Sequence, residues 1–371
     1  MVAIVACGNP GPSTARSSPT AQPTVTASPS ATASAQPSTP PSGAPGPPSL
    51  ITCGQTLPAG DNLVIGAVSG DPTVVVRDIQ DPSHARNLCS FDPAATAPQF
   101  VSATQVAYET GNQIIKADLT SGATTVIASY SPGFGSGQYS FSPDGKSITY
   151  MNGNAWHLAG PSGDRVLTTL PAVPARGSSA DEDDSFLSFS PDGLYIALLQ
   201  TFHTGGSGAT APDQVRKAGD GSLVFSTTGM TMGVWASVPS RLFFRDSGGA
   251  MHRWDPSTGL SSMMPLHWIN PHSSPDGRWI AYTFRTGTLG GVGFYSVQSN
   301  TVANTSPPGR FLPKFLTNDL VWYLGEKPCT TCFGSTPSGV SYIYDIAGTS
   351  EVVSRLAGVT DAWPHTTAPG L

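Results

Sequence analysis

The most constraining feature of the sequence is a six-residue phrase that occurs three times. "SFSPDG" stands at Ser140–Gly145 and again at Ser188–Gly193, and the near copy "HSSPDG" stands at His272–Gly277. Each copy follows a short apolar or aromatic run and precedes an alternating one, a pattern typical of two strands joined by a turn. Proline sets φ at the first turn position, and glycine supplies the positive φ of a bulged hairpin. Because the flanking strands recur with the turn, the phrase predicts a repeat architecture.

Degenerate copies lie before, between and after the three clear copies. Aligned on the residue before each turn, the anchor positions are Phe100, Phe141, Phe189, Trp235, Ser273, Phe315 and Trp363. The anchors recur every ~44 residues, the length of one four-stranded propeller blade. Seven anchors predict seven blades; six and eight remain the alternative counts, because the first repeat is poorly formed. At the anchor position, Trp235 and Trp363 are expected to pack in the core.

The first blade lacks an inner strand of its own. Its strands are expected in "NLVIGAV", "TVVVRDI" and "HARNLCS", and the C-terminal "TDAWPHT" is expected to supply the fourth. Pairing of strands from both ends of the chain closes the ring and removes exposed sheet edges. The predicted fold class is therefore an all-β, seven-bladed β-propeller over residues 51–371.

The repeat motifs also resemble a known family. The pattern of "SPDG", "xIxY" and "IYxxDxxTG" is similar to the TolB-like, WD-related propeller repeats of exported bacterial proteins. The resemblance covers about Leu50–Leu371. It implies the propeller fold and export from the cytoplasm, and it is nearly silent on function.

The composition agrees with short strands and many turns. The 371 residues include 41 Gly and 35 Pro, and only 11% are charged. Glycine and proline break helices and mark turns. Lys and Arg total 18, without runs, and the net charge is −6. Nucleic acid is not an expected partner, because phosphate binding needs a concentrated basic surface.

The N-terminal region has a different character. Residues 8–50 are mostly Pro, Ser, Thr, Ala and Gly, which predicts a disordered linker. Residues 1–7 end in "IVAC", which resembles the lipobox of bacterial lipoproteins and marks Cys7 for lipidation. The alternative is an accidental match, since a charged segment and a full apolar segment are missing. We expect an exported monomer on the extracytoplasmic side, held to the cell membrane only by this lipid.

Four further cysteines remain, namely Cys53, Cys89, Cys329 and Cys332. An exported protein would oxidise them, and four cysteines allow three pairings. Proximity favours Cys53–Cys89 with Cys329–Cys332. A redox or zinc motif at Cys329 and Cys332 is disfavoured, because no βαβ context and no second CxxC accompany it.

Candidate binding residues lie in three long insertions, Ala172–Ser185, Thr201–Ser222 and Gly325–Gly339. These are expected on the face opposite the SPDG turns, because long loops on a rigid scaffold are where binding residues concentrate. The acidic run in the first insertion offers hard oxygen ligands for Ca²⁺, although a solvated acidic loop is the simpler interpretation. The candidate residues in these insertions are Asp181, Glu182, Asp183, Asp184, His203 and Phe333. His267 and Trp268 are further candidates, expected as exposed aromatic residues near the channel mouth.

The sequence carries no catalytic signature that we recognise. It has no HExxH motif, no nucleophile elbow and no sialidase Asp-box, and its histidines lack the spacing of metal ligands. We therefore expect a non-catalytic propeller of the cell envelope, without a cofactor, that recognises a protein, peptide or glycan on the long-loop face. The alternative is a hydrolase or lyase with an acidic, cation-assisted site at the channel mouth. Carboxylates and a histidine converging there would favour the enzyme.

Overall fold

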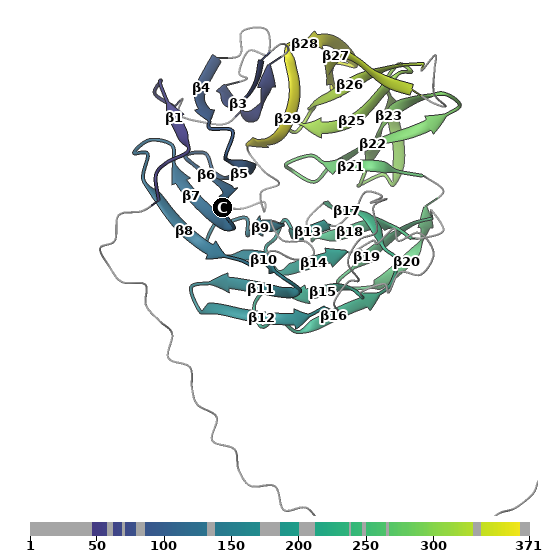
Figure 1. Ribbon diagram of the computed structural model, residues 1–371. Coiled ribbons are helices and arrows are strands. Elements are labelled where there is room, and N and C mark those ends of the chain that lie inside the picture. Colours follow the sequence, from purple (N-terminus) through teal and green to yellow (C-terminus); the bar gives the residue numbers. More distant parts are fainter. Residues whose placement is uncertain are drawn as a thin grey trace, which may run out of the picture. The chain divides into compact units, whose positions relative to one another are not determined.

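A computed structural model describes residues 47–57, 62–68, 71–78, 86–131, 138–170, 186–199, 212–236, 239–246, 250–264, 267–328 and 335–363. These residues contain strands and turns but no helix, and so no helix among them could span a membrane. The strands form seven antiparallel sheets that surround a central space as the blades of a seven-bladed β-propeller (Figure 1). The predicted fold class and blade number are thus confirmed.

Each blade is described from its innermost strand outwards. Blade 1 contains β29 (Leu356–Trp363), β2 (Leu63–Val68), β3 (Asp71–Asp78), β4 (Arg86–Phe91) and β1 (Ile51–Cys53). Blade 2 contains β5 (Thr96–Ser102), β6 (Gln105–Thr110), β7 (Gln113–Asp118) and β8 (Thr124–Ser129). Blade 3 contains β9 (Tyr139–Phe141), β10 (Ile148–Asn152), β11 (Ala155–Gly160) and β12 (Gly163–Thr169).

The other four blades repeat the plan. Blade 4 contains β13 (Phe186–Phe189), β14 (Tyr195–Leu199), β15 (Asp213–Lys217) and β16 (Leu223–Thr227). Blade 5 contains β17 (Thr231–Ala236), β18 (Arg241–Arg245), β19 (Met251–Asp255) and β20 (Gly259–Met264). Blade 6 contains β21 (Ile269–Ser273), β22 (Trp279–Thr286), β23 (Leu289–Ser296) and β24 (Thr301–Thr305). Blade 7 contains β25 (Arg310–Phe315), β26 (Leu320–Pro328), β27 (Ser335–Asp345) and β28 (Ser350–Ser354).

The second strand of each blade is apolar almost throughout. "YIALL" in β14 and "LFF" in β18 have buried side chains on both faces, because neighbouring blades cover both sides of each sheet. The fourth strands, such as β12 and β24, are mostly exposed. Blade-on-blade packing therefore forms the core. The anchors Phe100, Phe189, Trp235 and Phe315 are buried within it, and Trp363 is half-buried.

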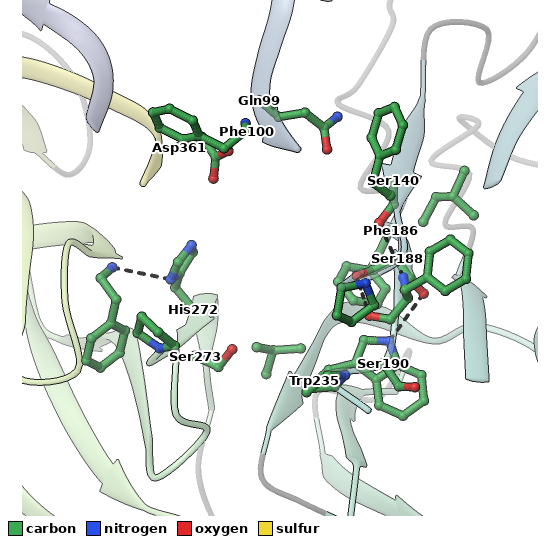
Figure 2. Close-up of a pocket in the computed structure, with 18 of the residues that line it drawn as sticks. Gln99, Phe100, Ser140, Phe186, Ser188, Ser190, Trp235, His272, Ser273 and Asp361 are labelled. Carbon is green, nitrogen blue, oxygen red and sulfur yellow. Dashed lines mark hydrogen bonds between the residues drawn. The ribbon is translucent and has the colours of Figure 1, made fainter. Parts of the chain in front are cut away.

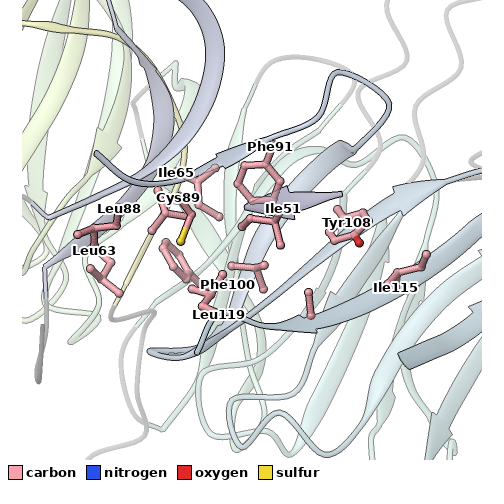
Figure 3. Packing of buried hydrophobic residues seen from close by; sticks show 13 residues of the cluster. Ile51, Leu63, Ile65, Leu88, Cys89, Phe91, Phe100, Tyr108, Ile115 and Leu119 are labelled. Carbon is pink, nitrogen blue, oxygen red and sulfur yellow. The ribbon is translucent and has the colours of Figure 1, made fainter. Parts of the chain in front are cut away.

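The ring is closed by the C-terminal strand β29, as predicted. It pairs antiparallel with β2, with Leu63 opposite Trp363 and Val64 opposite Ala362. Figure 3 shows Leu63 of blade 1 beside Phe100 of blade 2, in one apolar cluster that spans the two blades. Closure thus joins the two ends of the folded chain through both hydrogen bonds and core packing.

A fifth strand, β1, lies at the outer edge of blade 1, and the sequence pattern did not predict it. It pairs antiparallel with β4, so that Cys53 lies opposite Cys89 and forms a disulfide with it. This confirms the first of the two expected disulfides. Cys329 and Cys332 lie outside the described residues, as do Cys7 and the whole of residues 1–46.

The three SPDG turns share one hydrogen-bond network. In each turn the serine hydroxyl donates to the aspartate, from Ser142 to Asp144 Oδ1 at 2.6 Å and at 2.7 Å in the other two. The same serine oxygen accepts from the backbone N–H five residues later, and the aspartate accepts from the N–H two residues later. The glycines have φ between 66° and 68°. These contacts hold the turns in one geometry.

The turns are also linked from blade to blade. Asp192 and Ser240 exchange two hydrogen bonds between blades 4 and 5, and Asp276 N–H donates to Asn318 between blades 6 and 7. Because these turns follow the innermost strands, they all lie at one end of the ring, which we call the turn face. The connections from second to third strands and from blade to blade lie at the opposite end, which we call the loop face.

Candidate functional site

The innermost strands line a central cavity of about 430 Å³. Every blade contributes to its wall, which carries polar side chains such as Gln99, Ser140 and Ser273 and aromatic ones such as Phe186 and Trp235. In Figure 2, Ser140 and Ser188 lie on one side of the open space, and His272 and Ser273 lie across from them. A cavity of this size, with aromatic walls and a few polar groups, has the usual character of a small-molecule site.

Four innermost strands carry the same backbone irregularity near the loop face. Ala97, Met232, Asn270 and Leu312 have φ between 48° and 54°, and a register shift occurs at each of them. Left-handed backbone at a residue other than glycine costs about 1–3 kcal/mol and clusters at functional sites. Three of the four line a second cavity of about 310 Å³ at the loop-face mouth. The bulges set the direction of the side chains that follow them.

Two charged side chains face this channel. Lys314 lines both cavities, and burial lowers the pKa of its amine, an effect that the charge of Asp361 opposes. Asp361 accepts a hydrogen bond from the Phe100 N–H at 2.6 Å. His272 accepts one from the Phe315 N–H at 3.3 Å through Nδ1. The channel therefore combines one amine, one carboxylate and one imidazole.

The described channel wall contains few ionisable groups. No group of three His, Cys, Asp or Glu side chains that could hold a metal ion occurs among the described residues. Asp361 is the only carboxylate that the described wall of the larger cavity contains. What the channel does present is a cation, hydroxyl groups and aromatic surface.

These channel residues were missed from the sequence, although a signal existed. Gln99, His272 and Lys314 each stand directly before an anchor residue. The repeat alignment therefore assigns them to one structural position. The three residues are of different types and stand in strands of irregular sequence, so no motif marks them. Only the ring geometry brings the three to one wall.

Of the predicted binding residues, the structure describes only two, and one of these is exposed while the other is buried. His267 is exposed, on the connection that enters blade 6 at the loop face. Trp268 is fully buried, and its ring stacks on Tyr282 with centroids 5.2 Å apart. The expectation that Trp268 offers an exposed contact surface is therefore wrong, because its indole belongs to the core. Asp181, Glu182, Asp183, Asp184, His203 and Phe333 lie outside the described residues.

Two of the three predicted insertions contain regular structure. Residues 201–222 were expected to form one long loop, but Asp213–Lys217 is the strand β15, paired with β14 and β16. Residues 325–339 include a hairpin in which Glu326 lies opposite Pro337. A strand as polar as "DQVRK" forms because its neighbours supply the hydrogen bonds. The shorter connections 200–211 and 329–334 still join strand ends at the loop face.

A second unusual carboxyl lies between blades 2 and 3. Glu109 is 8% exposed, accepts a hydrogen bond from Tyr130 Oη at 3.0 Å through Oε2, and has no hydrogen-bond partner for Oε1 among the described residues. Desolvation raises the pKa of this carboxyl to about 7, although the Tyr130 hydrogen bond opposes the shift. Below about pH 7, the Glu109 carboxyl of the folded protein is therefore mainly protonated.

Glu109 should make stability depend on pH. Between pH 4.5 and about 7 the folded state holds a proton that the unfolded state has lost, so stability falls as the pH rises through this window. Glu109→Gln keeps the shape without the charge. We expect the variant to melt higher than the wild type at pH 8 and to match it near pH 4.5. Melting curves across this range test the prediction, and parallel curves for the two proteins would contradict it.

Comparisons with known proteins do not place the chain in a family. No protein-family model and no curated protein matches the chain. Similar solved structures include TolB from Acinetobacter baumannii, with 23% identity over 67% of each chain and a TM-score of 0.39. The propeller domain of Cps50 (Swd1) from Myceliophteria thermophila has 13% identity, with 74% of this chain and 96% of that chain covered and a TM-score of 0.44. Dihydro-heme d1 dehydrogenase NirN has 13% identity, with 84% and 80% covered and a TM-score of 0.46.

Proposed function

We propose that this protein is a non-catalytic binding propeller of the bacterial cell envelope that recognises a protein, peptide or glycan on its loop face. The observation that carries the proposal is the difference between the two faces. The turn face consists of short, nearly identical turns tied to one another by hydrogen bonds. The strand ends that flank connections 171–185, 200–211 and 329–334 lie at the loop face. Specific recognition requires loops that differ in sequence, held on a rigid scaffold.

The proposed location rests on the N-terminal sequence. Cys7 is preceded by a lipobox-like tripeptide and followed by a Pro- and Ser-rich stretch that could act as a spacer. The Cys53–Cys89 disulfide fits an oxidising compartment. We propose lipid attachment at Cys7, tested by labelling with a fatty-acid analogue in a form that carries a complete secretion signal. Equal labelling of wild type and Cys7→Ala would rule it out.

Binding is tested by comparing variants of the two faces. Proteins and glycans captured from envelope extract by the wild type are quantified against two loop-face variants, namely deletion of residues 204–210 and Asp183→Ala combined with Asp184→Ala. Asp144→Ala on the turn face is the matched control. It removes two hydrogen bonds and an ion pair with Lys146, and it should lower stability by about 1 kcal/mol while sparing capture.

The pattern of loss decides the outcome. We expect a species that Asp144→Ala retains and that both loop-face variants lose, while the melting temperatures of the loop-face variants stay near the wild-type value. Retention by the loop-face variants with loss in Asp144→Ala would assign binding to the other face. Conversion of a captured species into cleaved products would favour the hydrolase or lyase instead.

A further inference from the structure

Lys314 is a half-buried cation that makes no direct ion pair within the described part of the chain. Its side chain lines both channel cavities, and its Nζ makes no hydrogen bond or ion pair with any described residue. The lysine follows the bulge at Leu312 and Pro313 and precedes the buried anchor Phe315. An ammonium group withdrawn from water without a partner is costly. In an open cavity this cost is reduced if a bound anion completes the site.

A further free donor faces the same cavity. Ser273, in the neighbouring blade 6, lines the larger cavity, and its hydroxyl makes no hydrogen bond with the described residues. Ser140 uses its hydroxyl oxygen to accept from the Phe189 N–H at 3.3 Å, which leaves its own proton for donation. In Figure 2 both serines border the open space, from opposite sides. The wall thus offers neutral donors in addition to the cation.

The charges in the channel restrict the ligand to a single negative charge. Lys314 contributes one positive charge, and Asp361 contributes a negative charge close enough to affect the lysine pKa. A dianion such as phosphate would be repelled by Asp361 and would find no arginine fork for bidentate binding. A monocarboxylate needs one cation and one or two hydrogen-bond donors. That is the set present here.

The other residues that line the larger cavity favour a ligand with an apolar part. Phe186, Phe189, Trp235 and Phe315 line the cavity of about 430 Å³; Phe186 is half-buried, and the other three are largely buried between blades. Rings of this kind give large contact areas to flat apolar groups. The left-handed residues Met232, Asn270 and Leu312 at the mouth are an independent sign, because strained backbone concentrates at ligand sites.

We propose that the channel binds a small organic monocarboxylate, with Lys314 as the counter-ion of its carboxylate, Ser273 as a hydrogen-bond donor and the aromatic wall around its apolar body. The site lies on the channel wall between the two faces. It does not rest on the proposed function, since a partner on the loop face could bind with the channel empty or filled.

Benzoate is the probe, and benzamide is its neutral counterpart. Titration calorimetry with the full chain should detect benzoate binding, with benzamide at least 10-fold weaker. Lys314→Met, which keeps the length of the side chain and removes its charge, should weaken benzoate binding at least 10-fold. Lys146→Met on the turn face removes an exposed lysine outside the channel and should leave the affinity unchanged.

Two further variants separate a binding role from a folding role. Asp361→Asn removes the negative charge, keeps an acceptor for the Phe100 N–H, and should raise benzoate affinity several-fold. Ser273→Ala should lower it several-fold. Lys314→Met itself should melt at or near the wild-type temperature, because it removes a half-buried charge that makes no hydrogen bond to a described residue. If it fails to fold, the opposite changes expected for Asp361→Asn and Ser273→Ala decide the matter.

The proposal is overturned by any of three results. These are no binding of benzoate, equal benzoate affinity in wild type and a folded Lys314→Met variant, and tighter binding of inorganic phosphate than of benzoate. Loss of envelope partners by the loop-face variants bears only on the proposed function. A negative result in one experiment therefore does not affect the proposal that the other one tests.

Discussion

Replacing Gly66 with alanine is expected to open the ring and lower the free energy of unfolding by about 3 kcal/mol. A Cβ at Gly66 would lie 2.1 Å from the carbonyl oxygen of Gly358, which belongs to the backbone of the closing strand β29. Backbone cannot move aside as the end of a flexible side chain can. The strand would have to shift away from β2 and would carry Trp363 and Asp361 with it.

A shift of β29 in Gly66→Ala should disturb contacts in three blades. Strand β29 contacts blade 7, where Trp322 Nε1 donates to the Leu356 carbonyl at 3.0 Å, and blade 2, where Phe100 N–H donates to Asp361. Gly358→Ala is the matched control, because a Cβ there meets nothing within 4 Å. Chemical denaturation of both variants measures the difference. Equal stability of the two would contradict closure through β2 and β29.

Breaking the Cys53–Cys89 disulfide is expected to lower the free energy of unfolding by a similar amount. The bond joins residues 36 apart in the chain, and loop-closure entropy for a loop of that length corresponds to about 3–4 kcal/mol. Cys53→Ala should therefore be destabilised by about 3 kcal/mol. The disulfide is expected to stabilise the pairing of β1 with β4, at the outer edge of blade 1.

Reductant provides the internal control for this prediction. Treatment with dithiothreitol should lower the stability of the wild type to that of Cys53→Ala and should leave the variant unchanged. Adding Cys89→Ala to the first substitution should have a small further effect, because the bond is lost only once. A wild type that is insensitive to reductant would show that the disulfide does not form or does not contribute.

The fold could be predicted because short local sequence patterns mark each repeat. The SPDG phrase specifies a turn by backbone preferences, and anchors such as Phe189 and Phe315 mark the core. Closure was predictable because the first blade lacked an inner strand. β1 and β15 were not predicted, since "ITC" is too short for a pattern and "DQVRK" is too polar. Pairing with neighbouring strands stabilises both.

The candidate site was harder to predict than the fold. Trp268 was predicted as an exposed residue near the channel mouth, but an aromatic residue just before an innermost strand can equally pack between blades, as Trp268 does. Lys314 and Asp361 lie 47 residues apart by numbering and meet only through ring closure. A lone lysine in a strand carries no motif. The role proposed for Lys314 rests on the cavities that it lines.

The most direct test of the account is site-specific photo-crosslinking on the two faces. A photoreactive phenylalanine analogue is placed at His267, which is exposed at the loop face, or at Lys146, which is exposed at the turn face. Irradiation in intact envelope should give one dominant crosslinked species from position 267 and none from position 146. A dominant species from position 146 with none from position 267 would contradict the central claim that recognition occurs on the loop face.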